Sequence, residues 1–298
     1  MRERVELWRA AETLAREGVV GALATVSRHR GSLPMAQDAK MLVTEDGRRW
    51  GTVGGGCVEA DVTDQAIAAA RAGRPHIVRH TLNADEAGDI GLSCGGTVEL
   101  FLEPLAHAPE MAALYGAVAE AIVGRKAGTV YTGLDWSRGA RKLAVLGDET
   151  IGVGGGWVAT GGERGSNAAE GSRARRGTAS LDEEIGAFVE PIERVPRVIV
   201  FGAGHVGAEI ARLAARAGFH VLITDDRAEF ADARRVPEAH EVVVDDFRSV
   251  LDRMELDEDD YVLATTRGHS YDAQIIERTA ASPARYVGML GSRRKREV

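Results

Sequence analysis

A glycine pattern of the form G-x-G-x-x-G, with an apolar run before it and helical spacing after it, constrains this chain more than any other feature. The three glycines are Gly202, Gly204 and Gly207; residues 197–201 read as a strand and residues 206–217 as a helix. In this context the first glycine makes the tight turn, the second leaves space for a diphosphate, and the third lets the helix pack closely on the strand. The N-terminus of the helix then faces the anion. The pattern predicts a nucleotide-binding unit, and the alternative is a Rossmann-like fold that has lost its nucleotide.

The chain after residue 195 continues with an alternation of strands and helices. Such alternation predicts parallel βαβ units in a doubly wound sheet. The expected strands are residues 197–201, 220–224, 241–244, 261–264 and 286–289, and the expected helices are residues 206–217 and 272–281. The sequence stops at Val298, where a covering helix should follow residues 291–292, so we expect a truncated chain or a natural shortening.

Several polar residues accompany the glycine pattern. Asp225 ends the second strand, close to the ~20-residue separation expected of an acid that binds a ribose hydroxyl. Asp226 adds a second acid and Arg227 follows, which predicts that an unphosphorylated ribose, as in NAD, binds better than its 2′-phosphate analogue. His205 is either a solvated residue of the first helical turn or a contact for phosphate or substrate. His269 follows a strand end at the ligand-facing edge.

The first half of the chain mixes helices with short strands, which predicts an α+β domain. We expect a helix over residues 3–17, a strand over 19–26, and a hairpin over 40–53 with Asp46-Gly47 at its turn. Further elements are expected over residues 58–71 (helix), 77–82 and 97–102 (strands), 110–123 (helix), and 129–134 and 143–146 (strands). Residues 159–180 have no apolar period and predict a flexible loop rich in Gly, Ser and Arg. The predicted organisation is therefore a domain over 1–158, this loop, a connector over 181–195, and a Rossmann-like domain over 196–298.

Each of the two cysteines lies beside glycines. The two sequences consist of Gly54, Gly55, Gly56 and Cys57, and of Cys94, Gly95 and Gly96. Consecutive glycine N–H groups can form an anion nest, and a helix N-terminus such as that expected at Cys57 favours a thiolate. If the two loops converge, they offer two sulfur ligands, amide donors, and the carboxylates of Glu59 and Glu99. The alternative is that both cysteines are small buried apolar residues. A zinc site is not indicated, and His76 and His80 are interpreted as part of a solvated strand face.

Composition excludes several classes of function. The formal net charge of -8 argues against a nucleic-acid binder or an anionic-membrane binder. Two cysteines are too few for a disulfide framework and suit a reducing compartment. We expect neither a signal peptide nor a membrane span, and therefore a cytoplasmic protein.

Together these motifs resemble the XdhC/CoxI family, the xanthine dehydrogenase accessory factors. The matching stretches are residues 24–26 with 31–32, residues 54–61, residues 91–97, residues 200–207, residues 266–269 with Asp272, and residues 286–295. The resemblance spans nearly the whole chain except residues 159–180, where the insertion looks longer than expected. The family pattern continues for some tens of residues beyond the position where this sequence ends. The fold class that the resemblance implies is α/β, with an N-terminal α+β XdhC/CoxI-like domain and a C-terminal Rossmann-like domain.

The resemblance also implies a function. It implies an accessory chaperone that binds the molybdenum cofactor (molybdopterin), supports its sulfuration by a cysteine desulfurase, and inserts it into a molybdenum hydroxylase of the xanthine dehydrogenase or CO dehydrogenase type. Cys57 and Cys94 would carry the chemistry, Cys57 would hold molybdenum or relay sulfur, and a homodimer is expected. The alternatives are an NAD-dependent oxidoreductase, for which His269 is the best catalytic candidate, and a nucleotide-sensing regulatory module.

Overall fold

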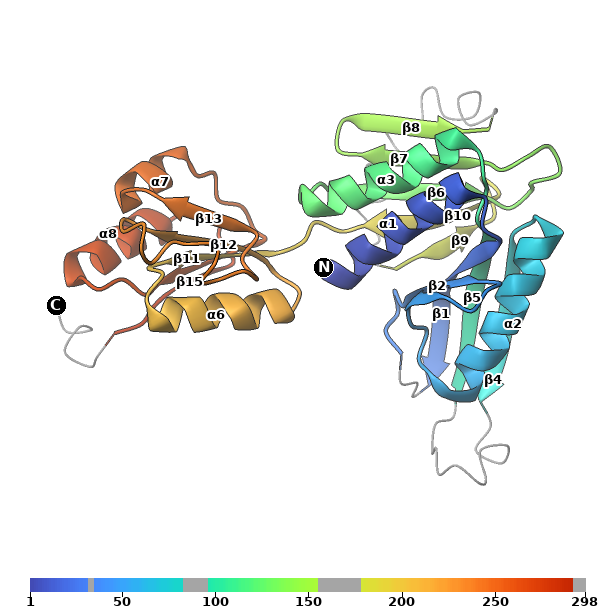
Figure 1. The fold of residues 1–298 in the computed structure, drawn as a ribbon, viewed down its shortest axis with the longest axis horizontal. Coiled ribbons are helices and arrows are strands. Elements are labelled where there is room, and N and C mark those ends of the chain that lie inside the picture. The colour runs from blue at the N-terminus through green and yellow to red at the C-terminus, as the bar shows by residue number, and fades with distance from the viewer. Residues whose placement is uncertain (32–34, 83–95, 155–177, 292–298) are drawn as a thin grey trace. The chain divides into compact units, whose positions relative to one another are not determined.

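The computed structural model describes residues 1–31, 35–82, 96–154 and 178–291. The chain divides into two compact units, which we call the N-terminal unit (Arg2–Glu193) and the C-terminal unit (Arg194–Val298). The N-terminal unit has two sheets and the C-terminal unit has one, and each unit has its own hydrophobic core (Figure 1).

The first sheet of the N-terminal unit is entirely antiparallel, in the order β3-β2-β1-β5-β4. Its strands are β1 (Gly21–Gly31), β2 (Lys40–Thr44), β3 (Arg49–Gly51), β4 (His76–Leu82) and β5 (Gly96–Pro104). Helix α2 (Gly56–Ala72) covers one face, where Val62 and Ala66 pack against Val26 and Val98. Because strand side chains alternate between faces, these apolar positions fix which face is buried under α2.

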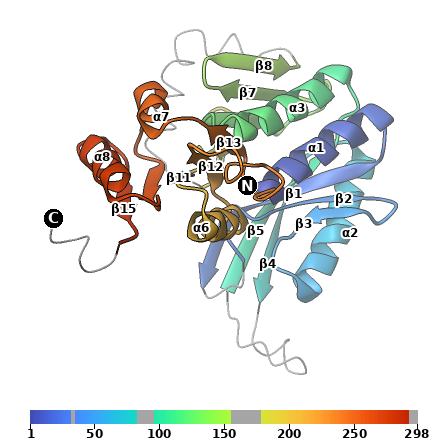
Figure 2. The same ribbon diagram turned by 60° about the vertical axis from the view of Figure 1, so that its left-hand side comes forward.

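The second sheet of the N-terminal unit is also antiparallel, in the order β8-β7-β6-β10-β9. Its strands are β6 (Gly128–Gly133), β7 (Lys142–Leu146), β8 (Glu149–Val153), β9 (Ser180–Asp182) and β10 (Ala187–Ile192). Helices α1 (Arg2–Glu17) and α3 (Pro109–Val123) lie side by side, and α3 packs on β7 and β8 (Figure 2). The segment 181–195, expected as a connector, thus contributes most of two strands to this sheet.

Buried contacts tie the two sheets of this unit together. Phe101 of β5 stacks on Phe188 of β10, with ring centroids 4.2 Å apart. Lys142 of β7 is fully buried, and its Nζ donates to both carboxylate oxygens of Glu103 at 2.6 Å and to Thr132 Oγ1 at 2.9 Å. Removing either partner of such a pair would leave an uncompensated charge in the core.

The C-terminal unit is a parallel sheet in the order β13-β12-β11-β14-β15. Its strands are β11 (Arg197–Phe201), β12 (His220–Asp225), β13 (Glu241–Val244), β14 (Asp260–Ala264) and β15 (Tyr286–Met289). One face packs under α6 (His205–Arg216), and the other under α7 (Phe247–Arg253) and α8 (His269–Thr279) (Figures 1 and 2). The strand order reverses between β11 and β14, which is where doubly wound sheets bind ligands. The predicted Rossmann-like sheet is confirmed.

The expected loop over residues 159–180 falls almost entirely outside the described residues, as do residues 292–298. In the part of the chain that is described, none of the helices combines the length and the apolar character needed to cross a bilayer.

Candidate functional site

The three glycines between β11 and α6, the glycine loop, have different surroundings. Gly202 has a φ of 105°, and a Cβ atom there would lie 2.6 Å from the Thr265 carbonyl oxygen. A Cβ atom at Gly207 would overlap the Gly202 carbonyl oxygen. At Gly204, by contrast, φ is -63° and a Cβ atom would meet nothing within 4 Å. The first and third glycines are therefore required by the fold, whereas Gly204 borders open space that a ligand can use.

Asp225 holds the glycine loop from the end of β12. Its Oδ2 accepts from the Ala203 N–H at 2.9 Å, and its Oδ1 accepts from the backbone N–H of Arg227 at 3.1 Å. The Arg227 guanidinium donates to both oxygens, at 2.9 and 3.2 Å. Burial opposes ionisation of this carboxyl, but the hydrogen bonds from Arg227 and Ala203 outweigh it and lower the pKa of Asp225. Asp225 is only 1% exposed, so its carboxylate is already occupied by the protein itself.

The glycine loop opens onto a cavity of about 600 Å³ at the ends of β11, β12 and β14. Among its lining residues are Gly204, His205 and Arg227, together with Thr265 and Arg267 from the loop after β14. His205 is exposed at the first position of α6, where backbone N–H groups have no partner within the helix. His269 is the remaining residue of this region that the sequence singled out, and it is the first residue of α8. The arrangement suits an anionic ligand.

Gly54, Gly55 and Gly56 form a second turn, the triple-glycine turn, at the start of α2. Their φ angles are 121°, 78° and 66°, a conformation that L-residues with a side chain rarely adopt. A Cβ atom at Gly55 or Gly56 would meet nothing within 4 Å, whereas one at Gly54 would lie 2.8 Å from Met35 Cε. Glycine is required here mainly by backbone conformation.

Glu59 closes this turn from within α2. Its carboxylate accepts hydrogen bonds from the Thr52 hydroxyl and from the Gly55 N–H, the latter at 3.2 Å, and forms an ion pair with Arg49. Thr52 Oγ1 also accepts from the Gly54 N–H at 3.1 Å. Burial opposes ionisation, but these hydrogen bonds and the Arg49 charge lower the pKa of Glu59. The amides of Gly54 and Gly55 are therefore used inside the turn, and the donors left for a ligand are those of the first turn of α2.

The two cysteine sequences are described only in part. Cys57 is the second residue of α2, inside the turn where unpaired N–H groups face outward from the helix end. Cys94 and Gly95 lie outside the described residues, and Gly96 begins β5 opposite Gly31 and Leu82. Among the described residues no cluster of three or more His, Cys, Asp or Glu side chains is arranged to hold a metal ion.

Glu59 and Glu99 lie on opposite faces of the first sheet, so the two carboxylates do not face one ligand as they would in converging cysteine loops. Val98 of β5 packs in the core beneath α2, and side chains alternate along a strand, so Glu99 lies on the other face of the sheet. There it pairs with Arg79 at 2.9 Å and accepts from the Ser27 hydroxyl at 3.4 Å. Glu59 belongs to α2, which covers the opposite face.

His80 differs from the solvated residue that its spacing indicated. Its side chain is 14% exposed, and its Nδ1 lies 3.1 Å from Asp61 Oδ2 of α2. Asp61 lies one helical turn after Cys57, so this pair stands close to the beginning of α2.

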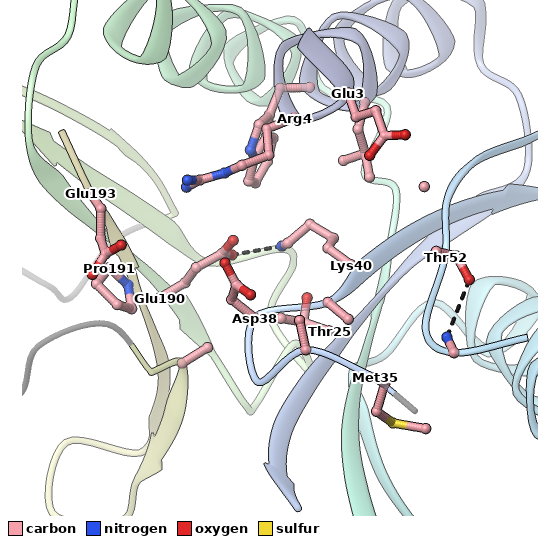
Figure 3. Close-up of a pocket in the computed structure, with 17 residues that line it drawn as sticks. Glu3, Arg4, Thr25, Met35, Asp38, Lys40, Thr52, Glu190, Pro191 and Glu193 are labelled. Carbon is pink, nitrogen blue, oxygen red and sulfur yellow. Dashed lines mark hydrogen bonds and ion pairs between the residues drawn. The ribbon is translucent and has the colours of Figure 1, made fainter. Parts of the chain in front are cut away.

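A cavity of about 290 Å³ borders the triple-glycine turn (Figure 3). Thr52 and Gly54 are among the residues that line it. Lys40 and Glu190 also line it and form an ion pair of 2.6 Å. Both of these side chains are nearly buried, at 10% and 13% exposure. The Lys40 ammonium also lies 4.7 Å from the ring centroid of Trp8. Sequence reasoning missed this site because the paired residues are 150 positions apart and neither belongs to a motif.

The two units thus define a protein that joins an antiparallel α+β unit bearing a glycine–cysteine turn to a Rossmann-type unit with an open glycine loop. The XdhC and CoxI family model matches residues 14–81, and the XdhC Rossmann domain model matches residues 198–298. The chain belongs to the XdhC and CoxI family.

Three similar proteins come from Bacillus subtilis, Escherichia coli and Bacillus halodurans. The chain is 26% identical to a Bacillus subtilis protein named as a probable subunit of xanthine dehydrogenase, over 91% of this chain and 79% of that protein. It is 36% identical to the molybdenum cofactor insertion chaperone PaoD of Escherichia coli, over 33% of this chain and 30% of that protein. A crystal structure described as a xanthine dehydrogenase from Bacillus halodurans superposes with a TM-score of 0.76 at 25% identity, covering 99% of this chain and 83% of that one.

Proposed function

We propose that this protein is a cytoplasmic maturation factor that binds the molybdenum cofactor as cargo, supports its sulfuration, and delivers it to a xanthine dehydrogenase-type molybdenum hydroxylase. Membership of the XdhC and CoxI family supports a maturation role, as do the names of the two relatives. The proposed partners are the hydroxylase, a cysteine desulfurase and a second copy of this chain.

The observation that carries the proposal is Cys57 in the first turn of α2, directly after three glycines with positive φ. Molybdopterin joins an anionic phosphate to a dithiolene-bound metal, so its binding calls for N–H donors and a soft ligand. The first helical turn supplies such donors, and its partial positive charge favours a thiolate at Cys57. Arg49 neutralises Glu59, so the turn presents no uncompensated carboxylate to an anionic cargo.

The two cysteines, the first turn of α2 and the glycine loop each have a role in this proposal. Cys57 either ligates the molybdenum or accepts sulfur from the desulfurase for transfer to it, and Cys94 acts as its partner thiol. The amides of Gly56 and Cys57 bind the phosphate or the pterin edge. In the C-terminal unit, the glycine loop with Gly204 and His205 grips a phosphate or nucleotide group.

The test is the molybdenum content of protein purified from a molybdenum-replete host. We expect the wild-type protein to retain molybdenum and a fluorescent pterin after oxidation. Cys57→Ser should lower the molybdenum per protomer by roughly tenfold or more. Even substitution of a residue that only orients a metal ligand lowers metal affinity by about that factor. The matched control is Asp64→Asn, an exposed position further along α2.

Activation of a cofactor-free hydroxylase gives a second readout. Cys57→Ser should fail to support it, whereas Asp64→Asn should support it normally. Unchanged molybdenum and activation in Cys57→Ser would return this cysteine to a packing role. Absence of molybdenum from the wild-type protein, together with saturable binding and oxidation of NADH, would instead favour a nicotinamide-dependent oxidoreductase.

A further inference from the structure

The acid expected to bind a ribose hydroxyl has no oxygen to offer one. Each carboxylate oxygen of Asp225 already accepts two N–H groups, from the Arg227 backbone and guanidinium at Oδ1 and from Ala203 and the guanidinium at Oδ2. A carboxylate has about four acceptor positions in all. Because Asp225 is also 1% exposed, a ribose could reach it only by displacing Arg227 and loosening the glycine loop.

Asp225 also lines the cavity, but the more exposed charged side chains that line it are donors. The Arg227 side chain is 31% exposed and that of Arg267 is 47% exposed, and both line the cavity. Arg227 uses its Nε and Nη2 on Asp225, and Arg267 uses one N–H from each terminal nitrogen on Asp226, at 3.1 and 2.9 Å. A guanidinium has five N–H groups, so both arginines keep N–H donors that can bind an oxygen of a ligand.

The two guanidinium groups converge on a single acid. Arg227 Nε lies 3.7 Å from Asp226 Oδ1, and Arg267 Nη2 lies 2.9 Å from Asp226 Oδ2. The two acids and two arginines balance in charge, which removes the repulsion that Asp225 and Asp226 alone would exert on a phosphate.

Both arginines are also fixed in place before any ligand binds. The Arg227 guanidinium lies 3.7 Å from the centroid of the Phe230 ring. The loop that carries Arg267 is tied to α8, because the Thr266 hydroxyl donates to Asp272 Oδ1 at 2.6 Å. Preorganised, charge-assisted donors of this kind bind phosphate oxygens strongly.

We propose that Arg227 and Arg267 form a second phosphate site at the edge of the glycine-loop cavity. The ligand class is then a nucleotide that carries a phosphomonoester on its ribose in addition to the 5′-phosphate held at the glycine loop. This replaces the expectation, drawn from the two acids in the sequence, that an unphosphorylated ribose is preferred. The inference goes beyond the proposed maturation role and does not depend on it.

Calorimetric titration with adenosine 2′,5′-bisphosphate and with 5′-AMP tests the proposal in low salt. We expect the bisphosphate to bind at least roughly tenfold more tightly, and the difference to shrink as the salt concentration rises. Arg267→Gln should bring the two affinities to within about threefold of each other by weakening only the bisphosphate. Arg267→Lys should restore part of the affinity difference between the two ligands, because lysine keeps the positive charge but lacks the forked N–H donors of a guanidinium. Gly204→Val should abolish binding of both ligands by occupying the space beside the glycine loop that the 5′-phosphate needs.

The matched control is Arg278→Gln. Arg278 is 42% exposed and pairs with Asp252 at the surface of the same unit, away from the residues that line the cavity, so its loss should leave both affinities unchanged. Equal affinities in the wild type, no binding of either nucleotide, or an equal effect of Arg278→Gln would each overturn the proposal. Cys57→Ser should bind both nucleotides normally, so this test and the molybdenum test fail independently.

Discussion

The triple-glycine turn of the N-terminal unit and the glycine loop of the C-terminal unit are held in similar ways. In each, a carboxylate accepts a hydrogen bond from a loop amide and is paired with an arginine: Glu59 with Arg49, and Asp225 with Arg227. They differ in where the acid comes from. Glu59 lies four residues along the helix that the turn begins, whereas Asp225 lies on the neighbouring strand. The first turn is therefore a local device, and the second depends on the assembled sheet.

The glycines differ as well. Positive φ angles explain Gly55 and Gly56, where a Cβ atom would meet nothing within 4 Å. At Gly207 the backbone is ordinary helix, and it is the close approach to Gly202 that excludes a side chain. Substitutions that test backbone conformation and steric space separately therefore show whether the two turns differ in this way.

The largest effect is expected at Gly207. Gly207→Ala should destabilise the C-terminal unit by about 3 kcal/mol or more, because helix α6 must move away from the glycine loop. The measurement is urea denaturation followed by far-ultraviolet circular dichroism. All four tryptophans (Trp8, Trp50, Trp136 and Trp157) precede residue 194, so fluorescence reports only on the N-terminal unit and should be unchanged.

The control for Gly207→Ala is Gly204→Ala. Its cost should be less than about 1 kcal/mol, because the position has open space and an ordinary φ. Equal destabilisation by the two changes would show that the glycines of this loop do not have separate roles.

The C-terminal sheet could be predicted from sequence because its signals are local. The strands Arg197–Phe201, Glu241–Val244 and Tyr286–Met289 have the bounds that the sequence predicts. Helix α7 was missed, since it has only seven residues and its clearest signal is the capping residue Asp246, whose side chain accepts from the Arg248 N–H. In the N-terminal unit, strand β9 was also missed, since it has only three residues and is defined by its pairing with β10.

The site was harder to predict because its contacts depend on side-chain geometry or on the packing of segments that are distant in sequence. The position of Asp225 followed from the motif, but its saturation by Arg227 and Ala203 depends on side-chain geometry that spacing does not encode. The separation of Glu59 from Glu99 depends on which face α2 covers. The ion pair of Lys40 with Glu190 joins two sheets and leaves no periodic signal.

The next largest effect is expected at Glu59. Glu59→Gln should destabilise the N-terminal unit by about 2 kcal/mol, because the Thr52 hydroxyl and the Gly55 amide lose a charged acceptor and Arg49 loses its partner. Urea denaturation followed by tryptophan fluorescence measures the change. Glu45→Gln is the control, since that acid pairs with Arg71 at a well-exposed surface position and should contribute little.

The pH dependence of the same variant checks the cause. The pKa of Glu59 is lowered by folding, so its contribution to stability is complete above the unfolded-state pKa of about 4.3 and is lost as pH falls through the lower folded-state pKa. Glu59→Gln should therefore lose less stability than the wild type on acidification. A parallel decline of the two proteins would mean that Glu59 is not the acid that supports the turn.

The smallest effect is expected at Gly56, and it separates conformation from space most directly. Gly56→Ala should cost about 1 kcal/mol, because its φ of 66° is unfavourable for alanine while its Cβ atom would meet nothing within 4 Å. Gly56→Asn should cost less, since asparagine tolerates the left-handed region better than alanine does. The same asparagine substitution at Gly207 should give no recovery relative to alanine, because the obstacle there is the Gly202 carbonyl. Tryptophan fluorescence in urea resolves the Gly56 pair, and circular dichroism resolves the Gly207 pair. If asparagine were no better than alanine at Gly56, a steric rather than a conformational requirement would govern the triple-glycine turn, and the distinction between the two turns would disappear.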